Sequence, residues 1–210
     1  MAVADVVGQP RRQAEPAQAA ADLFVRALER RKIEVVGWPR RQVVPEAAGE
    51  VARVESAPLA QVVEHVLAVS DNEGAEVLAR HVALAAGGKP SFSGATRAVE
   101  DAMADLGVDT SGARILDGSG LARGNRLDPD TLTSLITVLS GAEQADLRAA
   151  LTGLPVAGFS GSLAFRFDEG DPAGEGAVRA KTGTLSRVSG LAGTVTTVDG
   201  AVLGFVVVAD

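Results

Sequence analysis

The sequence predicts an α+β fold, in which helices come first along the chain and a β meander closes it. Apolar residues recur at helical spacing through most of the chain before Pro155, whereas the part after Pro155 is rich in glycine and contains β segments. Helices followed by strands is the order typical of an α+β domain. With 210 residues, of which 46% are hydrophobic, the chain is long enough for one globular domain with a core.

The N-terminal quarter is expected to contain one helix between less regular segments. Residues 1–16 are polar, contain two prolines and show no apolar period, so we interpret them as a disordered lead-in to a domain over residues 17–210. Apolar positions at helical spacing predict a helix over residues 17–31, and short β segments are expected over residues 33–36 and 51–54.

Further helices are predicted from their apolar faces and from the residues at their ends. Glycines mark several helix stops, and the aspartate-proline pair Asp128-Pro129 is a strong helix start. The expected helices lie between Pro58 and Ser70 and over residues 73–86, 93–106, 128–139 and 142–151. A short strand over residues 115–120 is expected to enter a turn at Asp117-Gly118-Ser119-Gly120.

The closing meander is predicted as three β segments, over residues 178–182, 188–198 and 201–208. The dipeptide Asp199-Gly200 is a hairpin turn between the last two. The last segment is an almost continuous apolar run rather than an alternation, so we expect it to need cover on both faces.

Composition excludes several classes of function. A net charge of −7 without any basic run argues against nucleic acid or an anionic membrane as the main partner. The absence of cysteine rules out disulfides and thiolate metal sites, and His65 and His81 lie outside any zinc-protease pattern, so we expect neither a metal nor a cofactor. These 210 residues also show no signal-peptide core and no bilayer-length apolar run, hence no export signal.

Two short motifs point to chemistry, namely Ser70-Asp71-Asn72 and Lys181-Thr182-Gly183. In that order they are two thirds of the active-site set of penicillin-interacting serine transferases, whose first member is Ser-x-x-Lys. That first member is not found in these residues, because none of the three lysines follows a serine or threonine by three positions. Each motif alone has an ordinary explanation, Ser-Asp-Asn as a helix cap and Lys-Thr-Gly as a strand-end turn.

Acyl transfer at a D-alanyl carbonyl needs a nucleophile, a route for its proton, donors for the oxyanion and a cation for the substrate carboxylate. The Ser70 hydroxyl suits proton transfer, the Asn72 amide suits substrate binding, and Lys181 supplies a compact charge whose pKa can shift. Thr182 and Thr184 share one strand face and can hold a carboxylate, while Gly183 permits close approach of substrate backbone. Gly118-Ser119-Gly120 is interpreted as a structural turn, since it does not match a nucleophile elbow.

Together these segments resemble the class C low-molecular-mass penicillin-binding proteins, the D-alanyl-D-alanine carboxypeptidase/endopeptidases of serine peptidase family S13. The resemblance is carried, in order, by Ser56-Ala-Pro-Leu59, Ser70-Asp-Asn72, Ala75-Glu76, Asp117-Gly-Ser-Gly-Leu121, Leu154-Pro-Val-Ala-Gly158, Gly161-Ser-Leu163, Arg179-Ala-Lys-Thr-Gly-Thr184 and Leu191-Ala-Gly193. It implies a β-lactamase/transpeptidase-like domain, an antiparallel sheet flanked by helices, that acts on peptidoglycan stem peptides outside the cytoplasmic membrane and binds β-lactams. It also implies that Ser70, Asn72 and Lys181 are catalytic and that the Thr184 N–H is one oxyanion donor.

In that family the nucleophile motif precedes the region seen here, so we interpret the chain as the C-terminal part of an incomplete domain that requires an N-terminal half. Three functional hypotheses follow. The first is the family peptidase, represented by its C-terminal part and inactive alone. The second is a catalytically inactive peptidoglycan-binding or structural remnant, and the third is an unrelated small-molecule-binding α+β domain, for which the motif series would be coincidence.

Overall fold

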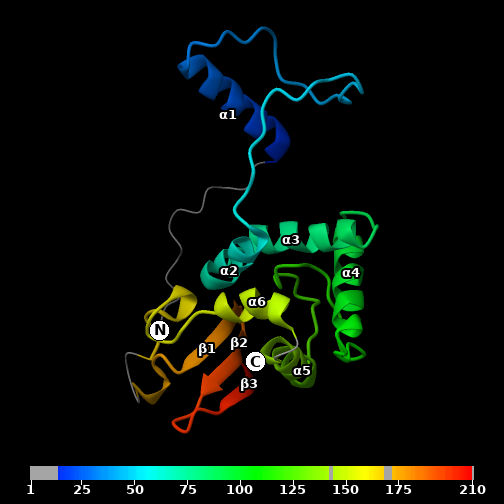
Figure 1. Cartoon of the computed structure of the whole chain (residues 1–210). Coiled ribbons are helices and arrows are strands. Elements are labelled where there is room, and N and C mark those ends of the chain that lie inside the picture. The colour runs from blue at the N-terminus through cyan, green and yellow to red at the C-terminus, as the bar shows by residue number, and fades with distance from the viewer. Residues whose placement is uncertain (1–13, 142–143, 168–171, 210) are drawn as a thin grey trace. The chain divides into compact units, whose positions relative to one another are not determined.

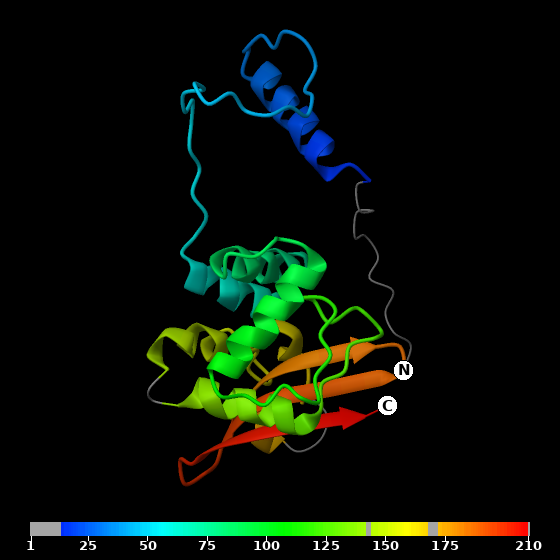
Figure 2. The same cartoon turned by 90° about the vertical axis from the view of Figure 1, so that its right-hand side faces the viewer.

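The computed structural model describes residues 14–141, 144–167 and 172–209, and the chain divides into two compact units, Met1–Val54 and Glu55–Asp210. Figures 1 and 2 show the elements of each unit from two directions. Within the described residues no helix combines the length and apolarity that crossing a bilayer requires.

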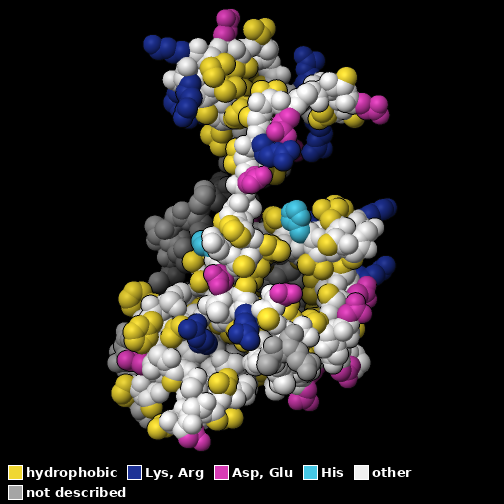
Figure 3. Space-filling view, in the orientation of Figure 1, with side chains coloured by type: hydrophobic (Ala, Val, Ile, Leu, Met, Phe, Trp, Pro, Cys, Tyr) yellow, Lys and Arg dark blue, Asp and Glu magenta, His cyan; other side chains and the backbone are white. Residues whose placement is uncertain are grey.

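In the first unit the predicted helix is confirmed as α1, Pro16–Arg30, which begins with proline in its first turn. Its Gln18 side chain donates hydrogen bonds to Asp22 and to the Pro39 carbonyl oxygen. The strands expected over residues 33–36 and 51–54 are wrong, since neither stretch has ladder partners among the described residues. Apolar side chains of this unit are exposed (Figure 3), as at Val36, which is 90% exposed.

In the second unit the four long helices agree with the predicted ones. They are α2 Leu59–Val69, α3 Asn72–Ala85, α4 Phe92–Asp105 and α5 Pro129–Ser140. Of these, α5 begins after the predicted cap Asp128. The Asp71 carboxylate accepts from the N–H groups of Glu73 and Gly74, and Asp128 accepts from Thr131, so each aspartate satisfies free donors of a first turn.

Two predictions in this unit need correction or completion. The helix expected over residues 142–151 is present from Ala145 as η1, Ala145–Leu147, and α6, Arg148–Thr152, while residues 142–143 lie outside the described residues. The strand expected over residues 115–120 is wrong. The N–H groups of Ile115, Leu116 and Gly118 donate to side-chain oxygens of Glu100, Asn125 and Glu76, so they are not available for a ladder.

The meander is confirmed as an antiparallel sheet in the order β1-β2-β3, with β1 Val178–Leu185, β2 Val188–Thr196 and β3 Val202–Ala209. In its register Thr182 pairs with Leu191, which pairs with Val207, so these three side chains share one face. We call this the Leu163 face, because η2, Gly161–Leu163, contacts β1 on this side. Residues of opposite parity, including Lys181 and Gly204, form the α5 face, where Ile136 of α5 contacts Gly204.

The core of the sheet lies on the Leu163 face. Ala157, Leu163, Val178 and Ala180 form a buried cluster. The partly buried side chains packed against it are Phe167, Leu191, Val195 and Phe205. Since Ala180 immediately precedes Lys181, the cluster fixes the start of the motif-bearing half of β1.

Candidate active site

Ser70 lies at the joint between α2 and α3, where the chain leaves one helix and enters the next. Its backbone is left-handed, with φ 57° and ψ 49°, and its N–H donates to the Val66 carbonyl oxygen at the end of α2. Left-handed backbone is uncommon for a residue with a Cβ and costs about 1 kcal/mol relative to glycine. Asp71 then caps α3. The serine therefore has a strained conformation at a position fixed by two helix ends.

Lys181 on β1 is joined directly to this joint. Its Nζ donates a hydrogen bond to Ser70 Oγ over 2.8 Å and another to the Thr182 carbonyl oxygen over 2.9 Å. Burial lowers the pKa of the Lys181 ammonium below its ordinary value. The fold thus brings together two predicted site residues that are 111 positions apart and makes the proton of Lys181 easier to remove.

The outer edge of β1 is paired at its start and open beyond it. The Ala157 N–H donates to the Val178 carbonyl and the Ala180 N–H donates to the Pro155 carbonyl, each over 2.9 Å. Because alternate residues of a strand direct their N–H groups to the same edge, those of Thr182 and Thr184 point to this edge too. Among the described residues no backbone carbonyl accepts from these two N–H groups, so both donors are available to a ligand.

Gly183 lies on this open part of the strand. A Cβ built on Gly183 would meet no atom within 4 Å, so the space beside it is empty in the described structure. The expected close approach of a substrate backbone therefore has room.

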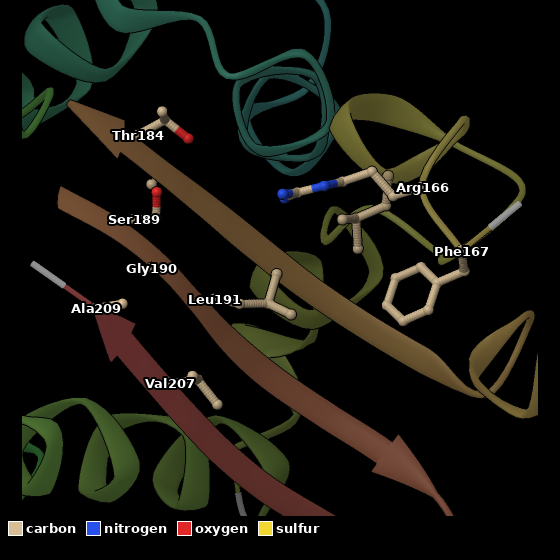
Figure 4. A pocket seen from close by; sticks show the side chains of 10 residues that line it. Arg166, Phe167, Thr184, Ser189, Gly190, Leu191, Val207 and Ala209 are labelled. Atoms are coloured by element: carbon tan, nitrogen blue, oxygen red, sulfur yellow. The ribbon is translucent and has the colours of Figure 1, made fainter. Parts of the chain in front are cut away.

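The side chains of Thr182 and Thr184 lie on the Leu163 face, opposite Lys181. The Thr182 hydroxyl donates to Ser162 Oγ over 2.9 Å. Thr184 lines a pocket of about 400 Å³ with Ser189, Leu191 and Val207 from the sheet and Arg166 and Phe167 from the segment after η2 (Figure 4). The pocket is mostly apolar, apart from Arg166 and the hydroxyls at its rim near Thr184.

Asn72 is the first residue of α3, two positions after Ser70. Within the described residues its side chain makes no hydrogen bond to Ser70 or Lys181, so the structure does not join it to that pair. Its role as an amide that binds substrate remains a prediction.

Glu76, one helical turn after Asn72, has a structural role that its position in the sequence did not reveal. Its Oε1 accepts from the N–H groups of Gly118 and Ser119 and from the Ser119 hydroxyl, over 2.8–3.2 Å. Its Oε2 is buried without a hydrogen-bond partner among the described residues. A Cβ on Gly118 would lie 2.7 Å from the Ala79 Cβ, so this turn needs glycine to contact α3. Ser119 is thus part of a structural turn, as predicted.

Asp117 closes the same turn through its carboxylate. Burial raises the pKa of Asp117, but hydrogen bonds from Asn125 and from the N–H groups of Ala122 and Gly120 outweigh it, so the net pKa is lowered. The charged carboxylate is therefore a stable acceptor that holds the turn and the loop after it together. Within the described residues no group of three His, Asp or Glu side chains is placed to hold a metal ion.

The sequence of this chain is similar to those of known proteins. A sequence model described as the D-Ala-D-Ala carboxypeptidase 3 (S13) family matches residues 3–210. The chain is 42% identical over 162 residues to Carboxypeptidase DacB of Mycolicibacterium smegmatis, covering 76% of this chain and 35% of that protein. It is 38% identical over 189 residues to a D-alanyl-D-alanine carboxypeptidase of Actinomadura sp., covering 86% of this chain and 34% of that protein.

The fold is similar to a solved structure as well. Penicillin binding protein 4 from Haemophilus influenzae superposes with a TM-score of 0.81 at 30% identity, covering 94% of this chain and 43% of that one. A second structure of that protein, complexed with a β-lactam, superposes with a TM-score of 0.78. The chain spans about a third of the length of the curated relatives that it matches.

Proposed function

Because the chain belongs to the D-Ala-D-Ala carboxypeptidase 3 (S13) family, we propose that it supplies part of the active site of a serine D-alanyl-D-alanine carboxypeptidase/endopeptidase acting on peptidoglycan stem peptides. The observation that carries this proposal is the 2.8 Å hydrogen bond from Lys181 Nζ to Ser70 Oγ. It joins the two motifs of a serine acyl transferase beside an open strand edge with free N–H donors.

The chemistry assigned to this chain is proton transfer and charge stabilisation. A serine of a Ser-x-x-Lys segment, supplied by polypeptide outside these 210 residues, attacks the penultimate D-alanyl carbonyl and forms an acyl-enzyme. Its proton passes through the Ser70 hydroxyl, held by Lys181, to the leaving nitrogen of the terminal D-alanine. Water then hydrolyses the ester and regenerates the serine.

The open edge of β1 offers hydrogen-bond donors for the oxyanion and for the carboxylate of the substrate. The Thr184 N–H is assigned as one oxyanion donor, because it points to the open edge next to the free space at Gly183. The Lys181 charge and the hydroxyls of Thr182 and Thr184 attract the terminal carboxylate of the substrate. Asn72, at the start of α3, is assigned to the backbone of the stem peptide.

Because peptidoglycan lies outside the cytoplasmic membrane, we expect the complete protein to act there, in the periplasm or cell wall. We also expect β-lactams to acylate the same serine. A second candidate function is a catalytically inactive peptidoglycan-binding remnant. It is favoured by the lack of a Ser-x-x-Lys motif within the 210 residues. The two candidates share a ligand and differ in turnover.

The test uses this chain together with a segment that carries Ser-x-x-Lys, either from its own gene or from the unmatched part of the M. smegmatis relative. We call this pair the assembled enzyme. It is expected to release D-alanine from a stem pentapeptide, and Lys181→Ala is expected to abolish most of that release. Lys89→Ala, a change of an exposed lysine outside the site, is the matched control. Binding of the peptide without any release of D-alanine would instead support the inactive remnant.

A further inference from the structure

Ser70 and Lys181 have the geometry of a nucleophile and its base, a role that the proposed peptidase reaction does not give them. A serine that acts as a nucleophile needs a base within hydrogen-bond reach and access to the substrate. Ser70 Oγ lies 2.8 Å from Lys181 Nζ, and Ser70 is exposed. Both conditions are therefore met by residues of this chain.

The backbone of Ser70 fixes the position of its hydroxyl. Ser70 has left-handed backbone, its N–H donates to the Val66 carbonyl oxygen at the end of α2, and Asp71 caps α3. A strained backbone at a sharp turn is also how the nucleophile elbow of other hydrolases exposes its serine, although that turn joins a strand to a helix. Lys181 approaches from β1, so the hydroxyl and the base are held by separate ordered elements.

Lys181 can keep both of its hydrogen bonds when it loses a proton. Its ammonium donates to Ser70 Oγ and to the Thr182 carbonyl oxygen. A neutral amine has two N–H donors and one lone pair, so it can still donate to the Thr182 carbonyl while it accepts the Ser70 proton. Burial lowers the pKa of Lys181, which makes the neutral amine more accessible than in a free lysine.

The open edge of β1 has the donors that an attack by Ser70 requires. The N–H groups of Thr182 and Thr184 point to this edge, and among the described residues no backbone carbonyl accepts from them. The space beside Gly183 is empty in the described structure. A small acyl group has room there, with N–H donors beside it for the developing oxyanion.

The leaving group determines which substrates this pair can use. In the peptidase reaction the Ser70 hydroxyl gives its proton to the leaving nitrogen, and Ser70 cannot do this while it attacks. Amides and β-lactams, whose nitrogen needs a proton in order to leave, are therefore poor substrates for the pair. The phenolate of an activated aryl ester leaves without a proton. Small activated esters are the class of substrate that fits.

We propose that Ser70 and Lys181 form a Ser–Lys catalytic dyad, with which this chain hydrolyses small activated esters without a Ser-x-x-Lys segment. Lys181 takes the Ser70 proton as Oγ bonds to the ester carbonyl carbon, and the bond from that carbon to the phenolate oxygen breaks. Lys181 then releases its proton to solvent. In the second step Lys181 takes a proton from water, the hydroxide attacks the acyl-serine, and the carboxylic acid leaves as Ser70 regains its proton. The net reaction converts an ester and water into an acid and a phenol.

The test measures nitrophenolate release from p-nitrophenyl acetate by the 210-residue chain. General base catalysis commonly contributes about 10²-fold or more, so Ser70→Ala and Lys181→Ala are each expected to lower the rate above background at least about tenfold. The double variant is expected to be no slower than either single one, because the two residues act as a unit. Lys181→Arg is expected to be as inactive as Lys181→Ala, since a guanidinium cannot accept a proton. Recovery of the rate by arginine would show that the lysine supplies only charge.

The matched control addresses the two exposed histidines, because imidazole also attacks activated esters. The His65→Gln/His81→Gln double variant is expected to keep the rate that depends on Ser70. Peptide mapping after rapid acid quenching is expected to place one acetyl group on Ser70. Incubation with benzylpenicillin is expected to leave Ser70 unmodified.

The same variants in the assembled enzyme, with its Ser-x-x-Lys serine changed to alanine, give the comparison should the chain alone fail to fold. A rate that is unchanged by Ser70→Ala, a rate that is lost with the histidines, or an acetyl group on another residue would overturn the inference. Release of D-alanine by the unmodified assembled enzyme is measured separately, so the dyad and the proposed peptidase can each fail without the other.

Discussion

The two outer strands of the sheet, β1 and β3, expose different chemistry. The outer edge of β1 is paired by the segment around Val156 up to Ala180 and then opens beside a lysine, two threonines and a glycine. β3, Val202–Ala209, is apolar almost throughout, and within the described residues its outer edge has no partner strand. An open polar edge suits a small ligand, whereas an open apolar edge needs another piece of polypeptide.

The side chains of β3 lead to the same conclusion on both of its faces. Leu203 and Val207 on the Leu163 face are 52% and 59% exposed, and Val202 and Val208 on the α5 face are 60% and 50% exposed. A strand that is solvated on one side normally alternates polar and apolar residues, which β3 does not do. We therefore expect β3 to be covered in the assembled enzyme, and β1 to remain open for substrate.

The largest expected effect is on stability, from a charge placed on β3. Val207→Asp in the assembled enzyme is expected to cost about 3–5 kcal/mol of unfolding free energy, because it buries an unpaired carboxylate. In the chain alone the same change is expected to lower the binding of a hydrophobic dye, since Val207 is exposed there. Chemical denaturation and dye fluorescence measure the two effects. Equal, small stability changes in both proteins would show that β3 has no cover.

A change on the β1 side should affect activity instead. Lys181→Ala and Ser70→Ala are each expected to lower carboxypeptidase turnover of the assembled enzyme by about 10²-fold, equivalent to about 2.7 kcal/mol, because each removes a proton-transfer or electrostatic group. Release of D-alanine from a stem pentapeptide measures this, with Lys89→Ala as the control. Wild-type turnover by the Lys181 variant would refute the role of that lysine.

Some of these structural features could be predicted from the sequence, and others could not. The helix caps at Asp71 and Asp128 were predictable because the side chain and the N–H groups that it accepts are neighbours in the chain. The strands expected near Val36 and Val51 failed because β-forming residues need a partner strand, which local sequence does not specify. The Thr182–Ser162 hydrogen bond and the Glu76 contacts depend on tertiary packing between distant segments, and no local pattern encodes them.

A smaller effect is expected at Ser70, which has left-handed backbone at the joint between α2 and α3. Ser70→Gly and Ser70→Ala both lose the hydroxyl and should be equally inactive. The glycine variant is expected to be more stable by about 1 kcal/mol, because only the alanine retains the steric cost of a Cβ at positive φ. Thermal unfolding of the two variants compares them directly. If the alanine variant is equally stable, the backbone of Ser70 is not strained.

The smallest expected effect is a shift in pH dependence. Burial lowers the Lys181 pKa, so the ammonium loses its proton at a lower pH than a free lysine does. The alkaline fall in kcat/KM is therefore expected below pH 10.5, the ordinary lysine pKa. Lys181→Arg should move that fall to higher pH, because a guanidinium remains charged. An alkaline limb at the same pH in both proteins would assign it to another group.

We propose that this chain supplies the Ser70–Lys181 half of a serine active site whose nucleophile lies on another segment. The most direct measurement is intact-mass analysis after incubation with benzylpenicillin, followed by peptide mapping, for the chain alone and for the assembled enzyme. We expect no stable adduct on the chain alone, and in the assembled enzyme one adduct on the serine of Ser-x-x-Lys. An adduct mapped to any serine within the 210 residues would contradict it.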